Sequence, residues 1–440
     1  MALINRNFTL LWSGQAVSQT GDFVFDTTLT LWVGTQLLAG SANAPAAVSG
    51  LLITVAVATL LVAPLAGVYV DRWDYRRTML GTDLIRAALI GAVAAMAFLP
   101  GGTVPTGVQM VVVYAAVFAN SAVSQFFTPA RFAIINDVVG AEERGRAAAI
   151  GQSTQAIASI LGPPLAAPLL YAAGVQWALA VNALSYLVSF VLVRAVDIPP
   201  HERPETAAAP DFRAEFVDGL RTSWRNPVVR VLLLVIALIS VGIGALNTVN
   251  VFFVTDNLHV DVRWFGTLDM ALGIGLLVGA ACAARLLGRF GNERTFSFGL
   301  LVMGVLLLGY SRMTSFWPAL VLIALIGPGL SALNAAVAPL LLGAVPQQYL
   351  GRVFSVINPV QQVASVIGMG LAGWLASSVL RGFHGQVGGL PLGRIDTILG
   401  GAALLVVVGA GYSLLALRAP VAPVAAADQA APADQAAQLD

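Results

Sequence analysis

Charged side chains are scarce in this chain. Asp, Glu, Lys and Arg together make up 10% of its 440 residues, whereas a soluble domain carries about 25%. Hydrophobic residues make up 58% of the sequence, so most of its length cannot face water. The composition therefore favours one or more spans across a lipid bilayer over a soluble fold.

Cysteine, histidine and lysine are rare or missing as well. Cys282 is the only cysteine, which excludes an intramolecular disulfide and a cysteine metal cluster. The three histidines, His201, His259 and His384, fall between the apolar segments, so histidine is a poor candidate for a proton relay within them. Lysine is absent, and every strongly basic side chain is an arginine.

Motifs for enzyme chemistry are also missing from the sequence. It contains no phosphate-binding glycine loop, no nucleophile elbow and no metal-ligand cluster. We therefore expect a protein that is not an enzyme, holds no cofactor or metal and does not couple directly to ATP. The arginines lie in loops between apolar segments, which argues against a nucleic acid as partner.

Apolar segments long enough to cross a bilayer recur along the chain. A spanning helix needs about 20 mostly apolar residues, and membrane helices tolerate internal Gly and Pro. We count twelve such segments: 8–38, 46–70, 78–99, 107–128, 147–173, 175–196, 228–255, 264–287, 295–311, 317–343, 353–380 and 397–417. They predict an all-α membrane protein with twelve transmembrane helices.

The arginines are distributed unequally between the two sides of these segments. If the N-terminus lies inside, eighteen of the 23 arginines fall on the inner side, four on the outer side, and Arg86 within a segment. Cytoplasmic loops of membrane proteins carry the excess of positive charge. We therefore expect a multi-pass protein of the cell inner (plasma) membrane with both termini in the cytoplasm.

One long polar connection divides the segments into two sets of six. Its first half is rich in Pro and Ala, and its second half has Phe212, Phe216 and Leu220 at helical spacing, which predicts an amphipathic helix on the membrane surface. The last residues are of low complexity and predict a disordered cytoplasmic tail. The expected organisation is a six-helix bundle at 1–196, this linker at 197–227, a second six-helix bundle at 228–418 and the tail at 419–440.

The two halves share a repeat. A shift of 206 in the numbering places residues 145–170 on residues 351–376, and the same residue type then recurs at Gly145, Arg146, Gln155, Ala158, Ser159, Gly162, Leu165, Ala166 and Leu169. A weaker match sets residues 67–77 over residues 284–294 at a shift of 217. Two six-helix halves with parallel repeats resemble the arrangement of major facilitator transporters, which implies a substrate site between the halves near the middle of the membrane.

The turn between the second and third segments carries a motif. Gly67, Asp71, Arg72, Arg76 and Arg77 resemble the signature loop of the major facilitator superfamily, with Asp74 in place of that loop's second Gly. This substitution resembles the macrolide-efflux branch of drug:proton antiporters. Further stretches that resemble that branch are "WSGQAVS" (12–18), "GTDLIRAALI" (81–90), "FFTPARFAIINDVV" (126–139), "EERGRAAAIGQS" (142–153), "LAVNALSYLVSF" (179–190) and "EFVDGLRTSWRNP" (215–227). The resemblance covers most of the N-terminal half and less of the C-terminal half.

The charges of this loop suit a cytoplasmic gate. Asp71 could accept backbone hydrogen bonds at the start of a neighbouring helix, and the arginines could pair with charged residues after the fourth segment. The expected gate partners are Arg131, Asp137, Glu142, Glu143 and Arg146. The alternative is that these arginines only anchor the turn to anionic lipid and fix the topology.

Four carboxylates fall inside apolar segments, where ionisable residues are costly and are functional candidates by default. Asp22 lies 16 residues beyond Arg6, about 24 Å along a helix, and Asp26 is one turn further on the same face. Two acids at this spacing disfavour joint ionisation, as a proton carrier requires. We expect Asp22 and Asp26 to couple protons or to line the substrate cavity; the alternative is that Asp22, after Gly21, caps a break in the helix.

The other two carboxylates lie in later segments. Asp83 and Arg86 are three residues apart, and we expect them to form an internal ion pair on one helix face. Asp269 is the deep acid of the C-terminal half and is a third candidate for proton coupling.

"LGPPLAAP" (161–168) in the fifth segment resembles the Gly-Pro signature of antiporters in this superfamily. Gly162, Pro163 and Pro164 would bend the helix and allow close packing against the partner half. The alternative is a proline kink that has no bearing on the direction of transport.

These features together suggest a secondary active transporter. The resemblance implies proton-coupled efflux of amphipathic or hydrophobic small molecules, macrolide-like drugs being the precedent, by alternating access of two rocking halves. The expected partners are such a substrate, protons and membrane lipids, and the expected state is a monomer. Alternatives are a siderophore or lysolipid exporter or flippase, a proton-coupled metabolite importer and, as a different class, a non-transporting membrane scaffold.

Overall fold

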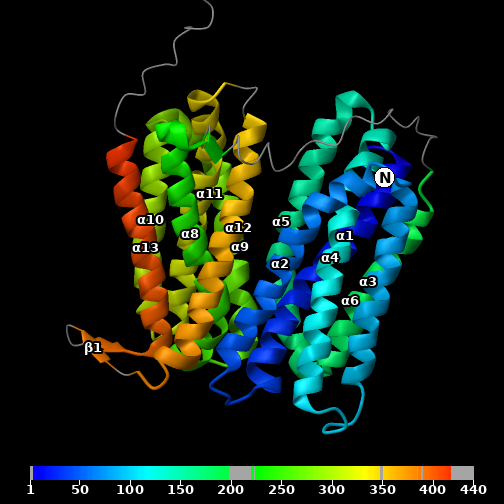
Figure 1. Cartoon of the computed structure of the whole chain (residues 1–440), viewed down its shortest axis with the longest axis horizontal. Coiled ribbons are helices and arrows are strands. Elements are labelled where there is room, and N and C mark those ends of the chain that lie inside the picture. Colours follow the sequence, from blue (N-terminus) through cyan, green and yellow to red (C-terminus); the bar gives the residue numbers. More distant parts are fainter. Residues whose placement is uncertain are drawn as a thin grey trace, which may run out of the picture.

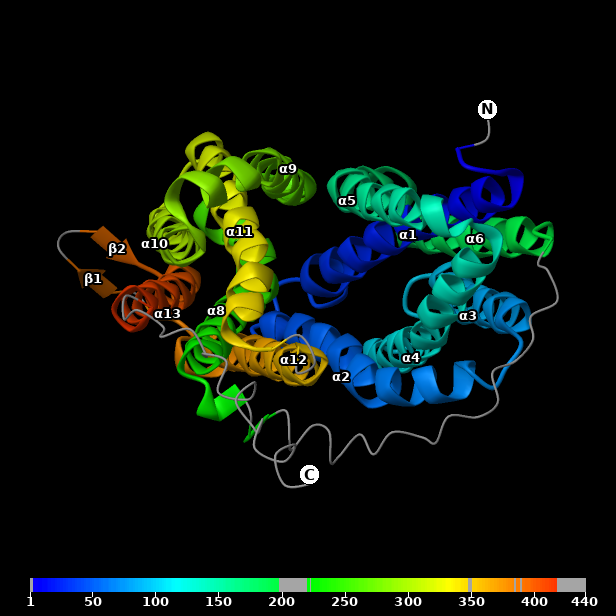
Figure 2. The same ribbon diagram turned by 90° about the horizontal axis from the view of Figure 1, so that it is seen from above.

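Two helical bundles lie side by side in the structure, a computed structural model (Figures 1 and 2). It describes residues 3–197, 220–221, 223–346, 350–383, 385–387 and 390–417. The first bundle contains α1 (Arg6–Leu31), α2 (Ala44–Val70), α3 (Tyr75–Ala97), α4 (Thr106–Val138), α5 (Arg144–Pro168) and α6 (Val175–Arg194). The second contains α8 (Pro227–Phe252), α9 (Phe265–Phe290), α10 (Asn292–Ser311), α11 (Phe316–Ala344), α12 (Leu350–Trp374) and α13 (Arg394–Ala416).

This architecture confirms the predicted all-α fold with twelve long helices. Eleven of the helices are long and apolar enough to span a membrane. α1 is not among these eleven, and its sequence includes the charged residues Arg6, Asp22 and Asp26. Most of the expected amphipathic helix in the linker, and the expected tail, lie outside the described residues.

Short elements complete the described part of the chain. Two 3-10 turns, η2 (Ala141–Glu143) and η5 (Val262–Trp264), precede α5 and α9. Between α12 and α13, the strands β1 (Gly385–Val387) and β2 (Leu390–Leu392) form an antiparallel hairpin.

Four helices end in a π-helical turn, and these turns repeat between the bundles. They are η1 (Trp32–Leu37) after α1, η3 (Leu169–Ala173) after α5, η4 (Phe253–Asn257) after α8, and η7 (Leu375–Val379) after α12. Adding 206 to 169–173 gives 375–379, which is the range of η7. The shift that aligns the two sequences therefore also superposes a local irregularity of the backbone, as expected for two copies of one bundle.

Side-chain caps at one end of the molecule start three helices. The side chains of Asn5, Asp74 and Asn226 accept hydrogen bonds from backbone N–H groups in the first turns of α1, α3 and α8. Such caps satisfy N–H groups that have no partner within the helix. We call this end the terminal face, because α1 starts and α13 ends there; the opposite face carries the β hairpin (Figure 1).

The two bundles contact each other near the opposite face. Ser49 of α2 donates a hydrogen bond to the carbonyl of Met369 in α12 at 2.7 Å, and the backbone N–H of Ala46 donates to Ser377 at 3.0 Å. The bundles diverge toward the terminal face (Figure 1). The opposite face is therefore closed, and the closure is made by α2 against α12 and α5 against α9.

Small residues allow this close contact. A Cβ added to Gly373 of α12 would lie 2.5 Å from the Cβ of Ser49. A Cβ added to Gly266 of α9 would overlap the backbone of Pro163 and lie 2.6 Å from the nitrogen of Pro164 in α5. Helices in membranes approach closely where such residues face each other.

Candidate functional site

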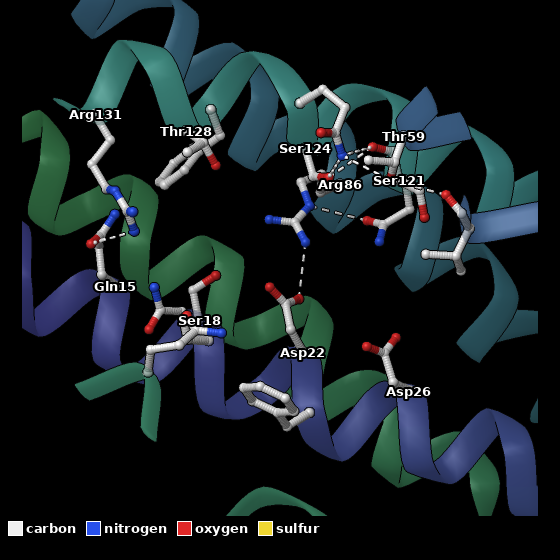
Figure 3. A pocket seen from close by; sticks show the side chains of 17 residues that line it. Gln15, Ser18, Asp22, Asp26, Thr59, Arg86, Ser121, Ser124, Thr128 and Arg131 are labelled. Atoms are coloured by element: carbon white, nitrogen blue, oxygen red, sulfur yellow. Dashed lines mark hydrogen bonds and ion pairs between the residues drawn. The ribbon is translucent and has the colours of Figure 1, made fainter. Parts of the chain in front are cut away.

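A polar cavity of about 430 Å³ lies in the N-terminal bundle. Its lining residues come from α1 to α5, and Figure 3 shows how they converge. They are Gln15, Ser18, Gln19, Asp22, Phe23, Asp26, Val55, Thr59, Arg86, Asn120, Ser121, Ser124, Gln125, Phe127, Thr128, Arg131 and Gln155. The two helix-one acids that the sequence singled out thus face one cavity together with two arginines.

Asp22 and Arg86 form an ion pair in the wall of this cavity. Arg86 Nη2 lies 2.9 Å from Asp22 Oδ1, and the Tyr186 hydroxyl donates to the same oxygen at 2.5 Å. Arg86 also donates to Tyr186 and, through Nε, to Asn120 Oδ1 at 3.2 Å. The guanidinium lies over the Tyr186 ring, 4.1 Å from its centroid. One carboxylate oxygen therefore receives charged and neutral donors from α3 and α6.

The structure corrects the expected partner of Arg86. We predicted an ion pair with Asp83 on the same helix, but the ion pair is with Asp22 of α1. Both Asp83 oxygens are buried and accept no hydrogen bond from any described residue. The spacing of three residues put both side chains on one face of α3, but packing turns the long Arg86 side chain toward α1 and away from its own helix.

Asp26 lies one turn beyond Asp22 and points into the same cavity (Figure 3). It is exposed, and its carboxylate forms no hydrogen bond or ion pair with another described side chain. Arg86 is engaged by Asp22, so the cavity contains one neutralised and one free carboxyl group. Of the two, Asp26 can bind and release a proton without breaking an ion pair.

Arg131 lines the cavity on the side toward the terminal face. Its Nη1 donates to Gln15 Oε1 of α1 at 3.0 Å (Figure 3). Its guanidinium lies 4.8 Å from the centroid of the Phe132 ring. We expected Arg131 to pair with the signature loop, but the structure places it between α1 and α4 instead. Its positive charge therefore contributes to the cavity.

The signature loop lies at the terminal face between α2 and α3. Asp74 accepts a hydrogen bond from the backbone N–H of Arg77 at 2.7 Å and so caps α3. Arg76 donates to the carbonyl of Arg194 at the end of α6. Asp71, Arg72 and Arg77 are exposed, and none of the three forms an ion pair with another described residue.

The other expected gate partners lie at the same face. Asp137 is near the end of α4 and, like Asp71, interacts electrostatically with Tyr75. Glu142 and Glu143 form the 3-10 turn before α5, and Arg146 is exposed in its first turn. The structure thus brings Asp71 of the loop and Asp137 of α4 close to the same tyrosine, Tyr75, and leaves open space around the Cβ position of Gly67.

Asp269 lies apart from the cavity. It is half-buried in α9, between Gly266 and Gly273, whose missing side chains make room for α5. It also interacts electrostatically with Tyr310, which donates a hydrogen bond to Asn250 at 2.6 Å. The three acids are therefore not one cluster: Asp22 and Asp26 share a cavity, and Asp269 belongs to the contact between the bundles.

The Gly-Pro motif of α5 contacts helices of both bundles. A Cβ on Gly162 would overlap Phe23 of α1, within the same bundle. The backbone of the adjacent Pro163 packs against Gly266 of the C-terminal bundle. We expected Gly162 to face the partner half, but Pro163 and Pro164 face it instead.

Tyr186 is a residue of the candidate site that the sequence analysis did not single out. It is fully buried in α6 and contacts both members of the ion pair. Its sequence environment, "NALSYLVSF", is mostly apolar, and a tyrosine there is typical of a core position. Asn182, one helical turn earlier, could have indicated this role, because a polar residue in a spanning segment usually has a polar partner. In the structure the Asn182 amide donates a hydrogen bond to the Tyr186 hydroxyl at 3.2 Å.

Comparison with known proteins concerns the family and the fold. Residues 11–252 and 232–390 match the family described as Major Facilitator Superfamily. Macrolide efflux protein A of Streptococcus pyogenes is 25% identical over 378 residues, which cover 84% of this chain and 90% of that protein. The multidrug efflux pump Tap of Mycolicibacterium fortuitum is 27% identical over 347 residues, which cover 74% of this chain and 79% of that pump.

A solved structure has the same fold. The nucleoside transporter NupG aligns with a TM-score of 0.71 at 11% identity, over 94% of this chain and all of that chain. At this identity the likeness concerns the fold.

Proposed function

Since the chain belongs to the Major Facilitator Superfamily, we propose that this membrane transporter exports amphipathic or hydrophobic small molecules, macrolide-like drugs among them, in exchange for protons. The observation that carries the proposal is the cavity of the N-terminal bundle, which has a free carboxyl group, Asp26, next to a neutralised one, Asp22. The efflux proteins that are similar over most of this chain support the direction and the class of substrate.

The lining of the cavity suits an amphipathic molecule. Polar groups dominate the wall formed by α1, α3 and α4, and Phe23, Val55 and Phe127 supply apolar surface beside them. Ligand sites commonly combine apolar walls with a few polar groups that fix orientation. A molecule with one polar end could therefore place that end at Asp26 and its apolar body against the aromatic rings.

The distribution of arginines supports placing the terminal face in the cytoplasm. The described state, closed at the opposite face, would then be open toward the cytoplasm and ready to accept substrate. In the reverse state the bundles would part at the contacts of Gly266 and Gly373, and the terminal face would close. The exposed Arg72 and Arg77 are available to hold that closed face.

Protonation of Asp26 would drive the cycle. A proton bound from outside removes the negative charge of Asp26 and releases a substrate that was held at this carboxylate. Return to the cytoplasmic side lets the proton leave and restores the charge. The monomer contains every group that this cycle uses.

Drug export by cells tests the proposal. We would express the chain in a drug-sensitised bacterial host and compare the wild type with Asp22→Asn and Asp26→Asn, using Asp261→Asn as the matched control. Asp261 is exposed at the opposite face, and an asparagine can keep its hydrogen bond to the Arg263 N–H. We expect erythromycin resistance from the wild type and the control, and loss of resistance in both cavity variants. Wild-type resistance no higher than that of the empty host would contradict the proposal.

A further inference from the structure

Asp83 is a buried carboxyl group that the proposed cycle does not use. Its side chain is fully buried in α3, and neither oxygen accepts a hydrogen bond from a described residue. Ser189 of α6 lies beside it and is equally buried, but the two groups do not complete a hydrogen bond of normal geometry. Buried polar groups nearly always have a partner, so this exception requires an explanation.

The positive charge of Arg86 can explain why Asp83 has no partner in this state. Arg86 lies one turn from Asp83 on the same face of α3, within reach of it. In the described state its guanidinium is engaged by Asp22, Tyr186 and Asn120 on the side of the cavity. One positive charge can neutralise one of the two carboxylates, and an ionised, unpaired carboxylate in a protein interior is strongly destabilising.

We propose that Arg86 pairs alternately with Asp22 and Asp83, and that Asp83 is a second proton-binding site. When Arg86 pairs with Asp22, Asp83 is neutral and carries the proton. When Asp22 takes up a proton, Arg86 turns to Asp83, which releases its own proton and becomes the partner. Each state holds one proton, and the three groups together have zero net charge throughout.

The surroundings of Asp83 allow this exchange. The charged groups that act on it are Arg86 from its own helix and Asp22 from α1, and the neighbouring hydroxyl is Ser189 from α6. Tyr186 lies flat under the guanidinium and donates to Asp22, so it can support the Arg86 side chain in either position. The exchange rests on the proposed function only for the entry of protons into this cavity, and it adds to the protonation of Asp26 a second protonation, that of Asp22.

Infrared spectroscopy of the purified full chain in lipid nanodiscs tests the exchange without measuring transport. A protonated carboxyl group gives a C=O stretching band that an ionised one lacks. We expect the wild type at neutral pH to show such a band that Asp83→Asn removes. Asp22→Asn should abolish the same band, because Arg86 is then free to pair with Asp83. Asp261→Asn should leave it unchanged.

Two results would overturn the proposal. A spectrum in which Asp83→Asn removes no band would mean that Asp83 is ionised in this state. A band that persists in Asp22→Asn would mean that Asp83 is a neutral structural residue and that Arg86 does not move. If Asp83→Asn does not fold, Asp83→Glu should shift the band instead of removing it. If the wild type exports no drug but the bands behave as expected, the proposed function is wrong and the proposed exchange is still supported.

Discussion

Gly266 offers a sharp test of the closed opposite face. Substitution by alanine adds a Cβ that would overlap the backbone of Pro163 and lie 2.6 Å from the Pro164 nitrogen. Backbone atoms of a proline pair cannot rotate away, so the two helices must separate. Overpacking of this kind costs about 1–3 kcal/mol, and about 2 kcal/mol corresponds to roughly a 30-fold fall in the ratio of the state closed at this face to the state open at it.

Distance measurements by electron paramagnetic resonance would detect that shift. In a Cys282→Ser background, spin labels at Ala148→Cys in α5 and Gly351→Cys in α12 report the separation of the bundles at the terminal face, where both residues are exposed. We expect Gly266→Ala to move the distance distribution toward shorter values. Gly288→Ala, on the same helix and with open space at its Cβ position, is the matched control. Identical distributions for the two alanine variants would refute the reasoning.

Three further predictions concern the ion pair and the cap of α3. Arg86→Ala leaves Asp22 without its cation and should lower the stability by about 3–5 kcal/mol, seen as a lower midpoint in thermal unfolding; an unchanged midpoint would contradict the described pair. Tyr186→Phe removes the neutral donor to Asp22 and should cost about 1–2 kcal/mol, with the same measurement as check. Asp74→Ala removes the cap of α3 and should cost about 1 kcal/mol, whereas Asp74→Asn, which can still accept the hydrogen bond, should be close to the wild type.

The fold was predictable because its determinants are local. Each spanning helix is encoded by its own run of apolar residues, and the repeat is visible as matching residues at a constant shift. α1 was recognised from its apolar residues even though it contains Arg6, Asp22 and Asp26 and is not among the eleven helices that qualify by composition.

The partners within the site were harder to predict because they come from different helices. Sequence spacing placed Asp83 nearest to Arg86, and only the packing of α1 and α3 against α6 reveals that the guanidinium turns toward Asp22. Arg131 shows the same limit, since its place near the inner end of the fourth segment did not indicate its contact with Gln15. Spacing identifies the face of a helix, but the direction of a long side chain depends on the space that its neighbours leave.

The most direct test of the account is proton-driven transport by the purified chain. Proteoliposomes with an imposed pH gradient would be assayed for radiolabelled erythromycin accumulation, with wild type, Asp26→Asn and Asp261→Asn side by side. The account predicts that wild type and Asp261→Asn accumulate erythromycin against its concentration gradient and that a protonophore abolishes this accumulation. It predicts no accumulation for Asp26→Asn. Accumulation by Asp26→Asn equal to that of the wild type, or wild-type accumulation that is insensitive to the protonophore, would contradict it.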